Sequence, residues 1–345
     1  MVPRKLNFRM PPEWAEHART FMEWPVQEAM CWPENHEQVC KGFAEIAQAI
    51  VEFEPVTMLV NPEGLAKAGR LCGPKVELLV IEHNDSWMRD NGPTFLINEQ
   101  SEVAGVNWQF NAWGGKYAPW DLDNQVAPKL LKHLEIPCFQ APFVLEGGAI
   151  HVDGEGTLLT TEECLLNQNR NAGLSREELV ELLKQYLNVD KIIWLKRGLY
   201  GDETDGHIDN VACFAKPGSV ILQTCQDPAD ANYQNTMENL KLLQNTTDAK
   251  GRRLSIIPIQ QPPARFYQGS RLTLSYLNFY FVNGGIILPV FGEESKQTDL
   301  FAEQALQKTF PERKIVKIDG MSIIKEGGNV HCITQQMPIG SPAKL

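Results

Sequence analysis

The pattern of apolar and polar residues predicts a chain that alternates between short strands and amphipathic helices. From His36 to Phe53 the apolar residues recur at the three- and four-residue spacing of a helix that packs against a core. Residues 56–60 and 76–81 are short apolar runs that predict strands, and an Asn-Pro turn signal closes the first run. An aromatic-rich segment, residues 14–25, precedes these elements.

From residue 94 onward one order of elements recurs, namely two strands joined by a turn, then a helix, then a further strand. The predicted units comprise strands 94–97 and 103–108, helix 123–134 and strand 136–139; strands 149–152 and 157–161, helix 175–187 and strand 191–195; strands 207–215 and 220–224, helix 229–245 and strand 254–259; and strands 274–282 and 286–290, helix 294–308 and strand 314–318. Ser175 and Glu178 have the spacing of a capping box. A fifth unit begins at residues 329–334, where the chain runs out.

The units have similar lengths, because their hairpins begin near residues 94, 149, 208, 274 and 329. The helix at 36–53 and the strand at 56–60 can complete the fifth unit. Five such units closed by the N-terminal segment predict a five-bladed α/β propeller, formed by residues 1–345 as a single domain. An ordinary open α/β sheet also alternates strands and helices, but the tight turns favour antiparallel hairpins within each unit.

Length and charge limit the partners. The chain has 345 residues, 43% of them hydrophobic, which is enough to bury a large core. The net charge of −11 disfavours nucleic acid and anionic membranes and favours a small cationic substrate. No stretch reaches the roughly 18 apolar residues that span a bilayer. We therefore expect no nucleic-acid or membrane partner.

The cysteines give no support to a zinc or redox motif. None of the eight forms a C-x-x-C pair; they stand at positions 31, 40, 72, 138, 164, 213, 225 and 332. Residues 1–12 lack the apolar run of a signal peptide. We therefore expect reduced thiols and a cytoplasmic location.

One motif occurs twice. Glu146–His151 and Glu326–His331 share the pattern Glu-Gly-Gly-x-Ile/Val-His, and Cys332 follows the second copy. Paired glycines let a ligand approach the backbone closely, so Cys332 is a candidate nucleophile. A free cysteine is more often a small buried apolar side chain. The two motif histidines are expected to make structural hydrogen bonds.

Reactive side chains gather where the hairpins begin. Asp90 and Glu146 precede the first two hairpins. His207 and Asp209 open the third, where alternation along a strand would place both on one face. Cys332 lies in the opening strand of the fifth. In a ring these positions converge on the axis, where a thiolate and an imidazole can perform covalent catalysis.

Carboxylates near a thiol raise its pKa and oppose thiolate formation. The conflict disappears if the substrate is a cation, and a planar guanidinium suits two carboxylates because each can accept paired N–H bonds. Structural readings stay open at this point. Asp85 and Asp90 could cap a turn, Asp209 could be an ion-pair partner, and Cys332 with His207 could bind a metal.

Five motifs resemble those of the agmatine deiminases, a branch of the guanidine-modifying enzymes that also contains the Porphyromonas-type peptidylarginine deiminases. The motifs are Trp87–Pro93, Asn111–Gly115, Glu146–Gly148 with His151–Gly154, Gly201–Asp209 and Gly327–Gln336. The resemblance extends over residues 8–338. It implies the family's five-bladed α/β propeller, the pentein fold.

The resemblance implies a role for each matching residue. Cys332 would attack the guanidinium carbon of agmatine and form a covalent thiouronium intermediate, with release of ammonia. His207 would protonate the leaving ammonia and then activate water, while Glu146 holds His207. Asp90 and Asp209 would grip the guanidinium nitrogens. Water would release N-carbamoylputrescine, a step of putrescine biosynthesis, without a metal or organic cofactor.

The resemblance also implies how the rest of the substrate would be held. Trp87 and Trp113 would wall the pocket around the alkyl chain. Glu203, Asp202 and Asp205 are candidates for the distal amine that the sequence does not rank. A homo-oligomer is expected from the family alone.

Alternative activities remain at this point. Free or peptidyl arginine would bring a carboxylate that needs a basic partner. Arg89 adjoins Asp90, although alternation could point it away. A transferase could use the same intermediate, and a guanidinium-binding protein would keep the aspartates without the cysteine or histidine. Glu326 stands where the family often has a third glycine.

Overall fold

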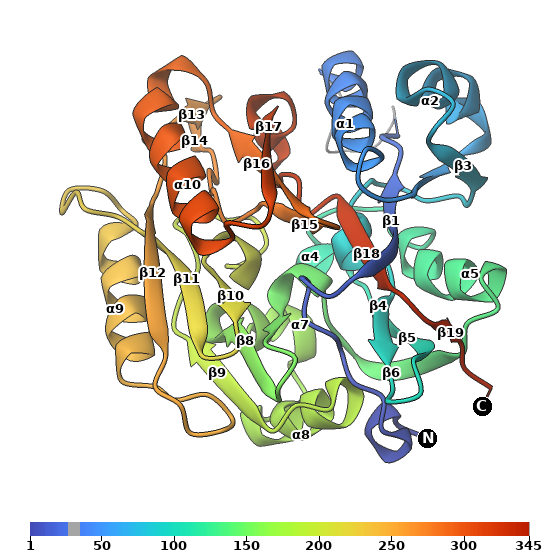
Figure 1. The fold of residues 1–345 in the computed structure, drawn as a ribbon, viewed down its shortest axis with the longest axis horizontal. Coiled ribbons are helices and arrows are strands. Elements are labelled where there is room, and N and C mark those ends of the chain that lie inside the picture. The colour runs from blue at the N-terminus through green and yellow to red at the C-terminus, as the bar shows by residue number, and fades with distance from the viewer. Residues whose placement is uncertain (27–34, 345) are drawn as a thin grey trace.

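The computed structural model describes residues 1–26 and 35–344 and shows a mixed α/β fold built from several small sheets (Figure 1). The long helices lie at the periphery and the strands lie toward the middle. Strands and helices alternate along the chain as predicted. Cys31 and the side chain of Glu326 lie outside what the structure describes.

The two ends of the chain meet in one sheet. Its strands are, in order, β18 (Thr334–Pro338), β1 (His17–Glu23), β2 (Val56–Val60) and β3 (Glu77–Val80). Strand β18 is antiparallel to β1, whereas β1, β2 and β3 are parallel. Helices α1 (His36–Ile50) and α2 (Leu65–Cys72) connect the parallel strands. The strand predicted at residues 56–60 thus lies in the same sheet as the C-terminal strand β18.

Four further sheets repeat an antiparallel pair followed by a parallel strand. They consist of β4 (Thr94–Ile97), β5 (Glu102–Gln109) and β6 (Cys138–Val144); β7 (His151–Val152), β8 (Thr157–Thr161) and β9 (Lys191–Leu195); β10 (Ala212–Lys216), β11 (Ser219–Thr224) and β12 (Ser255–Gln260); and β15 (Tyr280–Val282), β16 (Gly285–Val290) and β17 (Lys314–Asp319). The helices before the third strands are α5 (Val126–His133), α8 (Arg176–Leu187), α9 (Tyr233–Gln244) and α10 (Lys296–Thr309). The strand-strand-helix-strand order is therefore confirmed.

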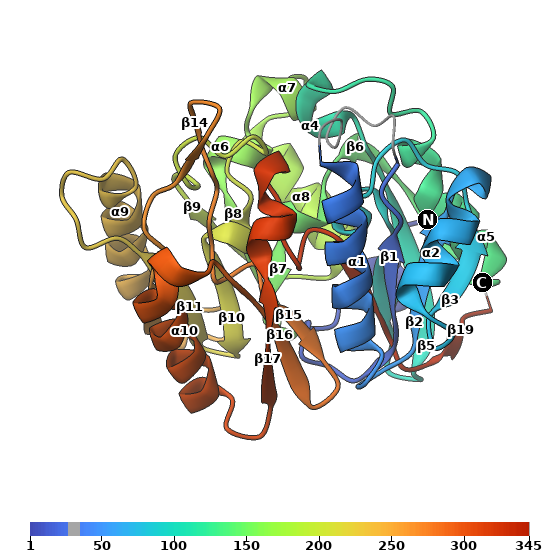
Figure 2. The same ribbon diagram turned by 90° about the horizontal axis from the view of Figure 1, so that it is seen from above.

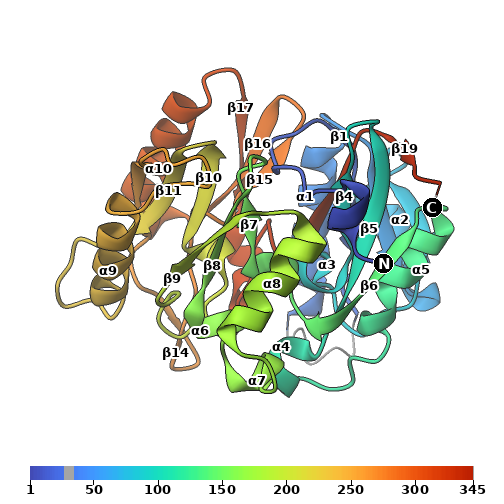
Figure 3. The ribbon, with the colours of Figure 1, turned by 90° about the horizontal axis from the view of Figure 1, so that it is seen from below.

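Short elements gather at one end of the molecule. Figures 2 and 3 place α4 (Ala112–Gly115), α7 (Gln168–Asn171) and strand β14 (Ser270–Arg271) at the same end. Strand β14 pairs with β13 (Phe266–Tyr267) in a hairpin that the apolar pattern did not predict.

The two termini lie near each other, and β19 (Ser341–Pro342) pairs with β5. The remaining short helices are α3 (Met88–Asn91) and α6 (Glu162–Leu165).

The predicted opening strands were wrong where they reached the polar motifs. Residues 147–149 and 208–210 form 3-10 turns, and β15 and β18 begin only at Tyr280 and Thr334. The reason is that backbone groups here bind side chains instead of a neighbouring strand. The Gly148 N–H donates to Asp90 Oδ1 at 2.9 Å, and the His331 N–H donates to Asn278 Oδ1 at 3.0 Å. Strand β1, in the aromatic-rich segment, was not predicted.

The helices follow their sequence signals closely. Helix α1 buries the periodic apolar face that the pattern predicted, including Val39, Phe43 and Ile46. Helix α8 begins with the predicted capping box, in which Ser175 Oγ accepts from the Glu178 N–H and Glu178 Oε2 accepts from the Ser175 N–H. Among residues 1–26 and 35–344, no helix combines the length and the apolar character that crossing a bilayer requires.

Candidate active site

Cys332 lines a narrow pocket of about 20 Å³ at the meeting point of several loops. The other lining residues are Trp87, Asp90, Trp113, Tyr117, Glu203, Thr204, Gly327 and Gly328. Five of the eight predicted site residues therefore share one pocket. The remaining three, Glu146, His207 and Asp209, are buried beside it.

The sulfur of Cys332 has a donor on one side and an acceptor on the other. Asn278 Nδ2 donates to Cys332 Sγ at 3.1 Å, and the thiol donates to Asp209 Oδ2 at 3.4 Å. The orientation of Asn278 is fixed because its Oδ1 accepts from the His331 and Cys332 N–H groups. Burial, followed by the charges of Asp209 and Asp90, raises the pKa of Cys332 well above its ordinary value. Without a bound cation, the group is therefore a thiol.

His207 is a buried imidazole with unused hydrogen-bonding capacity. Its Nδ1 lies 3.9 Å from Asp90 Oδ2 and its Nε2 lies 4.0 Å from Glu146 Oε2. Neither ring nitrogen has a hydrogen-bond partner among the described residues. Buried nitrogens are rarely left this way in folded proteins. The ring is thus free to exchange a proton with a bound molecule.

Gly148 is the point where three of these side chains converge. A Cβ atom here would lie 2.5 Å from His207 Nδ1, 2.9 Å from Asp90 Oδ1 and 3.0 Å from Asp209 Oδ2. Only glycine fits at such a distance. Asp209 lies in a 3-10 turn, Ile208–Asn210, and His207 directly precedes that turn, so neither is on the predicted strand, yet both side chains reach the same place.

The two aspartates have different electrostatic environments. Burial raises the pKa of Asp90, with the charges of Asp209 and Glu146 adding to the effect. Burial also acts to raise the pKa of Asp209, but the hydrogen bond and charge of His331 hold that pKa below its ordinary value. A cation bound between them would relieve the like-charge repulsion that acts on Asp90.

Trp113 reaches the pocket from an unusual backbone turn. Four consecutive residues, Ala112 to Gly115, have positive φ values of 52°, 54°, 93° and 75°. The left-handed conformation costs about 1–2 kcal/mol for each non-glycine residue. The turn directs the Trp113 indole N–H to Asp90 Oδ2 at 2.9 Å, and Trp87 packs against Trp113 edge to face at 6.1 Å between ring centroids. Such strain is typical of binding sites.

Arg170 ties Glu146 to the pocket loops. Its Nε donates to Glu146 Oε1 at 2.6 Å, and its other nitrogens donate to the Trp113 and Thr204 carbonyls and to Asp205 Oδ2. The side chain is fully buried. Arg170 therefore fixes the position of Glu146 and leaves Glu146 Oε2 directed to His207. On the same side, Glu146, Cys164 and His207 form a group whose atoms could hold a metal ion.

The two histidines of the repeated motif converge on one buried carboxylate. His331 Nε2 lies 2.9 Å from Glu13 Oε1, and His151 Nε2 lies 3.6 Å from Glu13 Oε2. His331 Nδ1 also bonds to Asp209 Oδ2 at 2.9 Å. Burial and Arg89 act to lower the pKa of His331, but Glu13 and Asp209 outweigh them and raise it. His151 Nδ1 in addition accepts from the Phe214 N–H at 3.3 Å, so both histidines make hydrogen bonds within the protein, as predicted.

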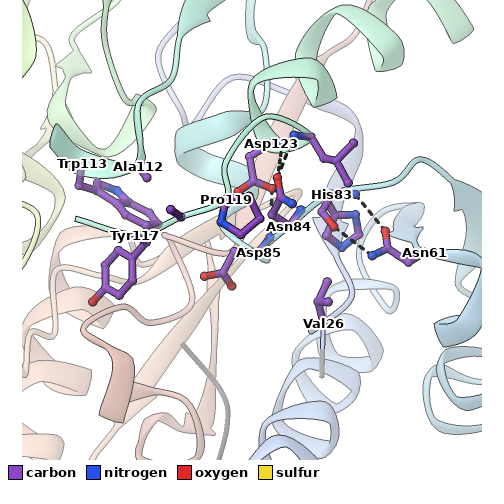
Figure 4. A pocket seen from close by; sticks show the side chains of 12 residues that line it. Val26, Asn61, His83, Asn84, Asp85, Ala112, Trp113, Tyr117, Pro119 and Asp123 are labelled. Carbon is purple, nitrogen blue, oxygen red and sulfur yellow. Dashed lines mark hydrogen bonds between the residues drawn. The ribbon is translucent and has the colours of Figure 1, made fainter. Parts of the chain in front are cut away.

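A second pocket of about 300 Å³ lies behind Trp113 and Tyr117 (Figure 4). Asn84 and Asp123 hold its wall together, because Asp123 Oδ1 accepts from the Asn84 N–H and Asn84 Oδ1 accepts from the Leu122 N–H. Burial, helped by the charge of Asp85, raises the pKa of Asp123 to about 7. These bonds support the loop that carries Trp87.

Comparison with known proteins places this geometry in a family. The family model of the Porphyromonas-type peptidyl-arginine deiminases matches residues 9–338. The chain belongs to this family. The resemblance noted in the sequence is therefore confirmed for nearly the whole chain.

Several known proteins resemble the chain over nearly its full length. Agmatine deiminase of Pseudomonas syringae is 45% identical over 361 residues, which cover 98% of this chain and 97% of the relative. The structure of agmatine deiminase from Enterococcus faecalis superposes with a TM-score of 0.93 at 37% identity, covering 98% of this chain and 97% of that one. A cysteine-to-serine variant of C. jejuni agmatine deiminase with substrate bound superposes at 0.89 with 28% identity, covering 97% of both chains.

The three acidic side chains considered for the distal amine differ in what they contact. Glu203 lines the pocket, where the Tyr117 hydroxyl donates to it. Asp205 is occupied by Arg170 and Lys116, and Asp202 by Thr204. Among these acids, Glu203 is thus the one that lines the pocket.

Arg89, the basic residue considered for an arginine carboxylate, is turned away from the pocket. Its Nη2 donates to Gln336 Oε1 at 2.8 Å, its Nε donates to the His331 carbonyl, and its Nη1 lies 3.6 Å from Glu13. Arg89 thus points away as the sequence had left open, but it does so from the helical turn α3 and not by alternation along a strand.

Proposed function

We propose that this chain hydrolyses agmatine to N-carbamoylputrescine and ammonia. The observation that carries the proposal is the convergence of Asp90, Asp209 and His207 on Gly148, beside the Cys332 thiol. Two carboxylates around one point suit a planar guanidinium, and the thiol and imidazole supply a nucleophile and a proton carrier. The family relatives named above, which are agmatine deiminases, support the same substrate.

In the first half of the proposed reaction, the guanidinium binds between Asp90 and Asp209. Its charge offsets the carboxylates that raise the pKa of Cys332, so the thiol can give its proton to His207. Asn278 then donates to the thiolate, which attacks the guanidinium carbon and forms the C–S bond. His207 passes the proton to one nitrogen, the C–N bond breaks, and ammonia leaves a thiouronium intermediate on Cys332.

In the second half, water attacks the thiouronium carbon. His207 takes a proton from the water, and Glu146, held by Arg170, stabilises the resulting imidazolium. The C–S bond then breaks, the sulfur leaves with its electron pair and takes the proton of the new hydroxyl group, and the carbonyl of the carbamoyl product forms. The proton held by His207 then goes to solvent. The same imidazole thus serves as acid in the first half and as base in the second.

The pocket walls support a linear amine rather than an amino acid. Trp87 and Trp113 flank the position of an alkyl chain, and the carboxylate of Glu203 suits a terminal ammonium. Free or peptidyl arginine, the alternative substrate, would need a cation for its carboxyl or carbonyl group. Arg89 is occupied elsewhere, and Lys116 is bound to Asp205 and to the Glu203 carbonyl.

We further propose that the five sheets close into a five-bladed α/β propeller, so that residues 1–345 act as one catalytic domain. The repeated sheet order and the pairing of β1 with β18, which lets the N-terminal segment complete the last blade, support this arrangement. We place the enzyme in the cytoplasm, because the seven cysteines of the described chain are free thiols. We place it in putrescine biosynthesis on the family resemblance alone. A homo-oligomer is proposed from the family resemblance.

The experiment that tests the substrate is ammonia release from agmatine, arginine and an arginine peptide offered in parallel. We expect release from agmatine, with at least ten times lower kcat/KM for the other two. Cys332→Ser is the matched inactive control. Release mainly from the arginine compounds would contradict the substrate assignment, and normal turnover by Cys332→Ser would contradict the nucleophile.

A further inference from the structure

Cys164 is a buried thiol next to the active site that the proposed reaction does not use. It lies in α6, directly after β8, and is fully buried. Its Sγ, a carboxylate oxygen of Glu146 and a ring nitrogen of His207 all lie within 4.8 Å of one another. Three different ligand types therefore meet on the side of His207 that faces Glu146.

Two members of this group have unused acceptor atoms. Glu146 Oε2 and His207 Nε2 are 4.0 Å apart, and neither has a hydrogen-bond partner among the described residues. Leaving a buried polar atom without a hydrogen bond destabilises the folded protein. An ion bound between them would satisfy both atoms at once.

The donor set fits a soft divalent ion. Thiolate, imidazole and carboxylate are the three ligand types of zinc. In a tetrahedral zinc site with bonds of about 2.0–2.3 Å, ligand atoms lie about 3.4 Å apart. The three ligand atoms now lie within 4.8 Å of one another, and they would reach the tetrahedral spacing if each moved inward by roughly an ångström or less.

The charges also balance. The Cys164 thiolate and the Glu146 carboxylate together neutralise a divalent ion, while Arg170 stays paired with Asp205 at 2.6 Å. The bond from Arg170 Nε to Glu146 Oε1 fixes the carboxylate from behind, as outer hydrogen bonds do for many metal ligands.

We propose that Glu146, Cys164 and His207 form an inhibitory site for a soft divalent metal ion such as Zn²⁺. Binding forms one metal–sulfur, one metal–nitrogen and one metal–oxygen bond, and the Cys164 thiol proton goes to solvent. His207 then cannot carry a proton to or from the substrate, so turnover stops until a chelator removes the ion. The metal is an inhibitor here and takes no part in the reaction.

A cobalt spectrum tests the site without relying on the proposed activity. Co²⁺ is added to Cys332→Ser, so that a thiolate-to-cobalt absorption band cannot come from the nucleophile. We expect the band in Cys332→Ser. We also expect it in the double variant that combines Cys332→Ser with Cys213→Ala, a control that removes another buried thiol. The band is expected to vanish when Cys164→Ala or Cys164→Ser is added, the serine variant preserving the packing. A band that survives both Cys164 changes, or no band in Cys332→Ser, would overturn the proposal.

Zinc inhibition provides the second readout, with each rate expressed relative to the same variant without metal. Cys164→Ser should need at least tenfold more Zn²⁺ for half inhibition than the unchanged chain, whereas Cys213→Ala should need the same amount. Equal zinc dependence in all three would contradict an inhibitory site. A failure of the deiminase proposal leaves the cobalt result unaffected, so the two can be told apart.

Discussion

The amide nitrogen of Asn278 donates a hydrogen bond to the sulfur of Cys332 at 3.1 Å. This neutral donor opposes the two carboxylates that raise the pKa of the thiol. Since Asn278 Oδ1 accepts from the His331 N–H, the amide cannot turn its oxygen to the sulfur without losing that bond. The candidate active site thus combines an acidic surrounding, suited to a cation, with one neutral donor at the sulfur.

Replacing Asn278 with alanine should make Cys332 less reactive. A hydrogen bond to a charged group contributes about 1.5–3 kcal/mol, so kcat/KM should fall by roughly 10- to 150-fold. The rate of Cys332 alkylation by iodoacetamide should fall with it. Asn245→Ala, on an exposed side chain, is the control and should behave like the unchanged chain. An alkylation rate that stays the same in Asn278→Ala would show that the bond does not tune the sulfur.

Adding one methyl group at Gly148 should abolish turnover. The new Cβ would lie within 3.0 Å of His207 Nδ1, Asp90 Oδ1 and Asp209 Oδ2, so these side chains would have to move from their positions. We expect Gly148→Ala to lower kcat/KM at least 100-fold. Gly173→Ala is the matched control, because a Cβ there meets nothing within 4 Å. Near-normal turnover by Gly148→Ala would contradict the convergence.

Arg170→Lys should reduce both activity and stability. Lysine cannot replace the several N–H bonds to Glu146, Asp205 and the Trp113 and Thr204 carbonyls. Breaking a buried pair of this kind costs about 3–5 kcal/mol, measurable by urea unfolding. We expect kcat to fall more than KM rises. Arg176→Lys, at a half-exposed pair on α8, should change neither, and an unchanged kcat in Arg170→Lys would refute the positioning of Glu146.

The buried pair of Glu13 and His331 predicts a pH effect on stability. Because the pKa of His331 is raised on folding, its contribution is fully present below about pH 6.5 and is lost as the pH rises through the folded pKa. Glu13 has a lowered pKa, so its contribution is present above about pH 4.3 and is lost as the pH falls through the folded value. In both cases the attraction between the two charged groups outweighs the free energy that burying each charge costs.

Glu13→Gln should therefore lower the free energy of unfolding by about 3–5 kcal/mol near neutral pH. It should also flatten the decline in stability above about pH 6.5, since His331 loses one of its two carboxylate partners. Urea unfolding between about pH 5 and pH 9 measures both. The exposed Glu16→Gln is the control. If the free energy of unfolding of Glu13→Gln declined above about pH 6.5 as steeply as that of the unchanged chain, Glu13 would not be what favours the protonated form of His331.

Glu203→Gln should mainly affect substrate binding. Loss of one carboxylate from the pocket wall removes the proposed partner of the distal ammonium. An exposed or half-exposed charge pair contributes on the order of 1 kcal/mol, so KM for agmatine should rise about fivefold with little change in kcat. If KM stays constant while kcat falls, Glu203 acts on the chemistry instead.

The repeat and its consequence could be predicted from the sequence. Similar spacing of hairpins placed Asp90, Glu146, Asp209 and Cys332 at equivalent positions. In the structure Asp90 and Cys332 line one pocket, and Glu146 and Asp209 are buried beside it. Strands β2, β4, β8 and β9 match the predicted ranges, because short apolar runs bounded by turns give a clear signal. The prediction worked where pattern and topology agreed.

The polar residues that hold the site together were not predictable in the same way. Arg170 and Glu13 are single polar residues outside the predicted elements, and Asn278 is one polar residue within the predicted strand 274–282. Their roles arise only from three-dimensional contacts. The strand predicted through His207 and Asp209 was wrong because the polar groups there turn toward the pocket and leave the ladder. A clue for Arg170 would have been a basic residue in an otherwise polar loop, which is a weak signal.

The most direct test of covalent catalysis by Cys332 is mass spectrometry of the protein after rapid acid quenching during turnover of agmatine. We predict a protein species that is heavier than the free protein by the mass of agmatine less ammonia. After digestion the added mass should lie on the peptide that contains Cys332, and it should be absent from Cys332→Ser. Two results would contradict covalent catalysis by Cys332. One is turnover of agmatine by the unchanged chain with no such species in that chain or in His207→Ala, and the other is an adduct on another residue.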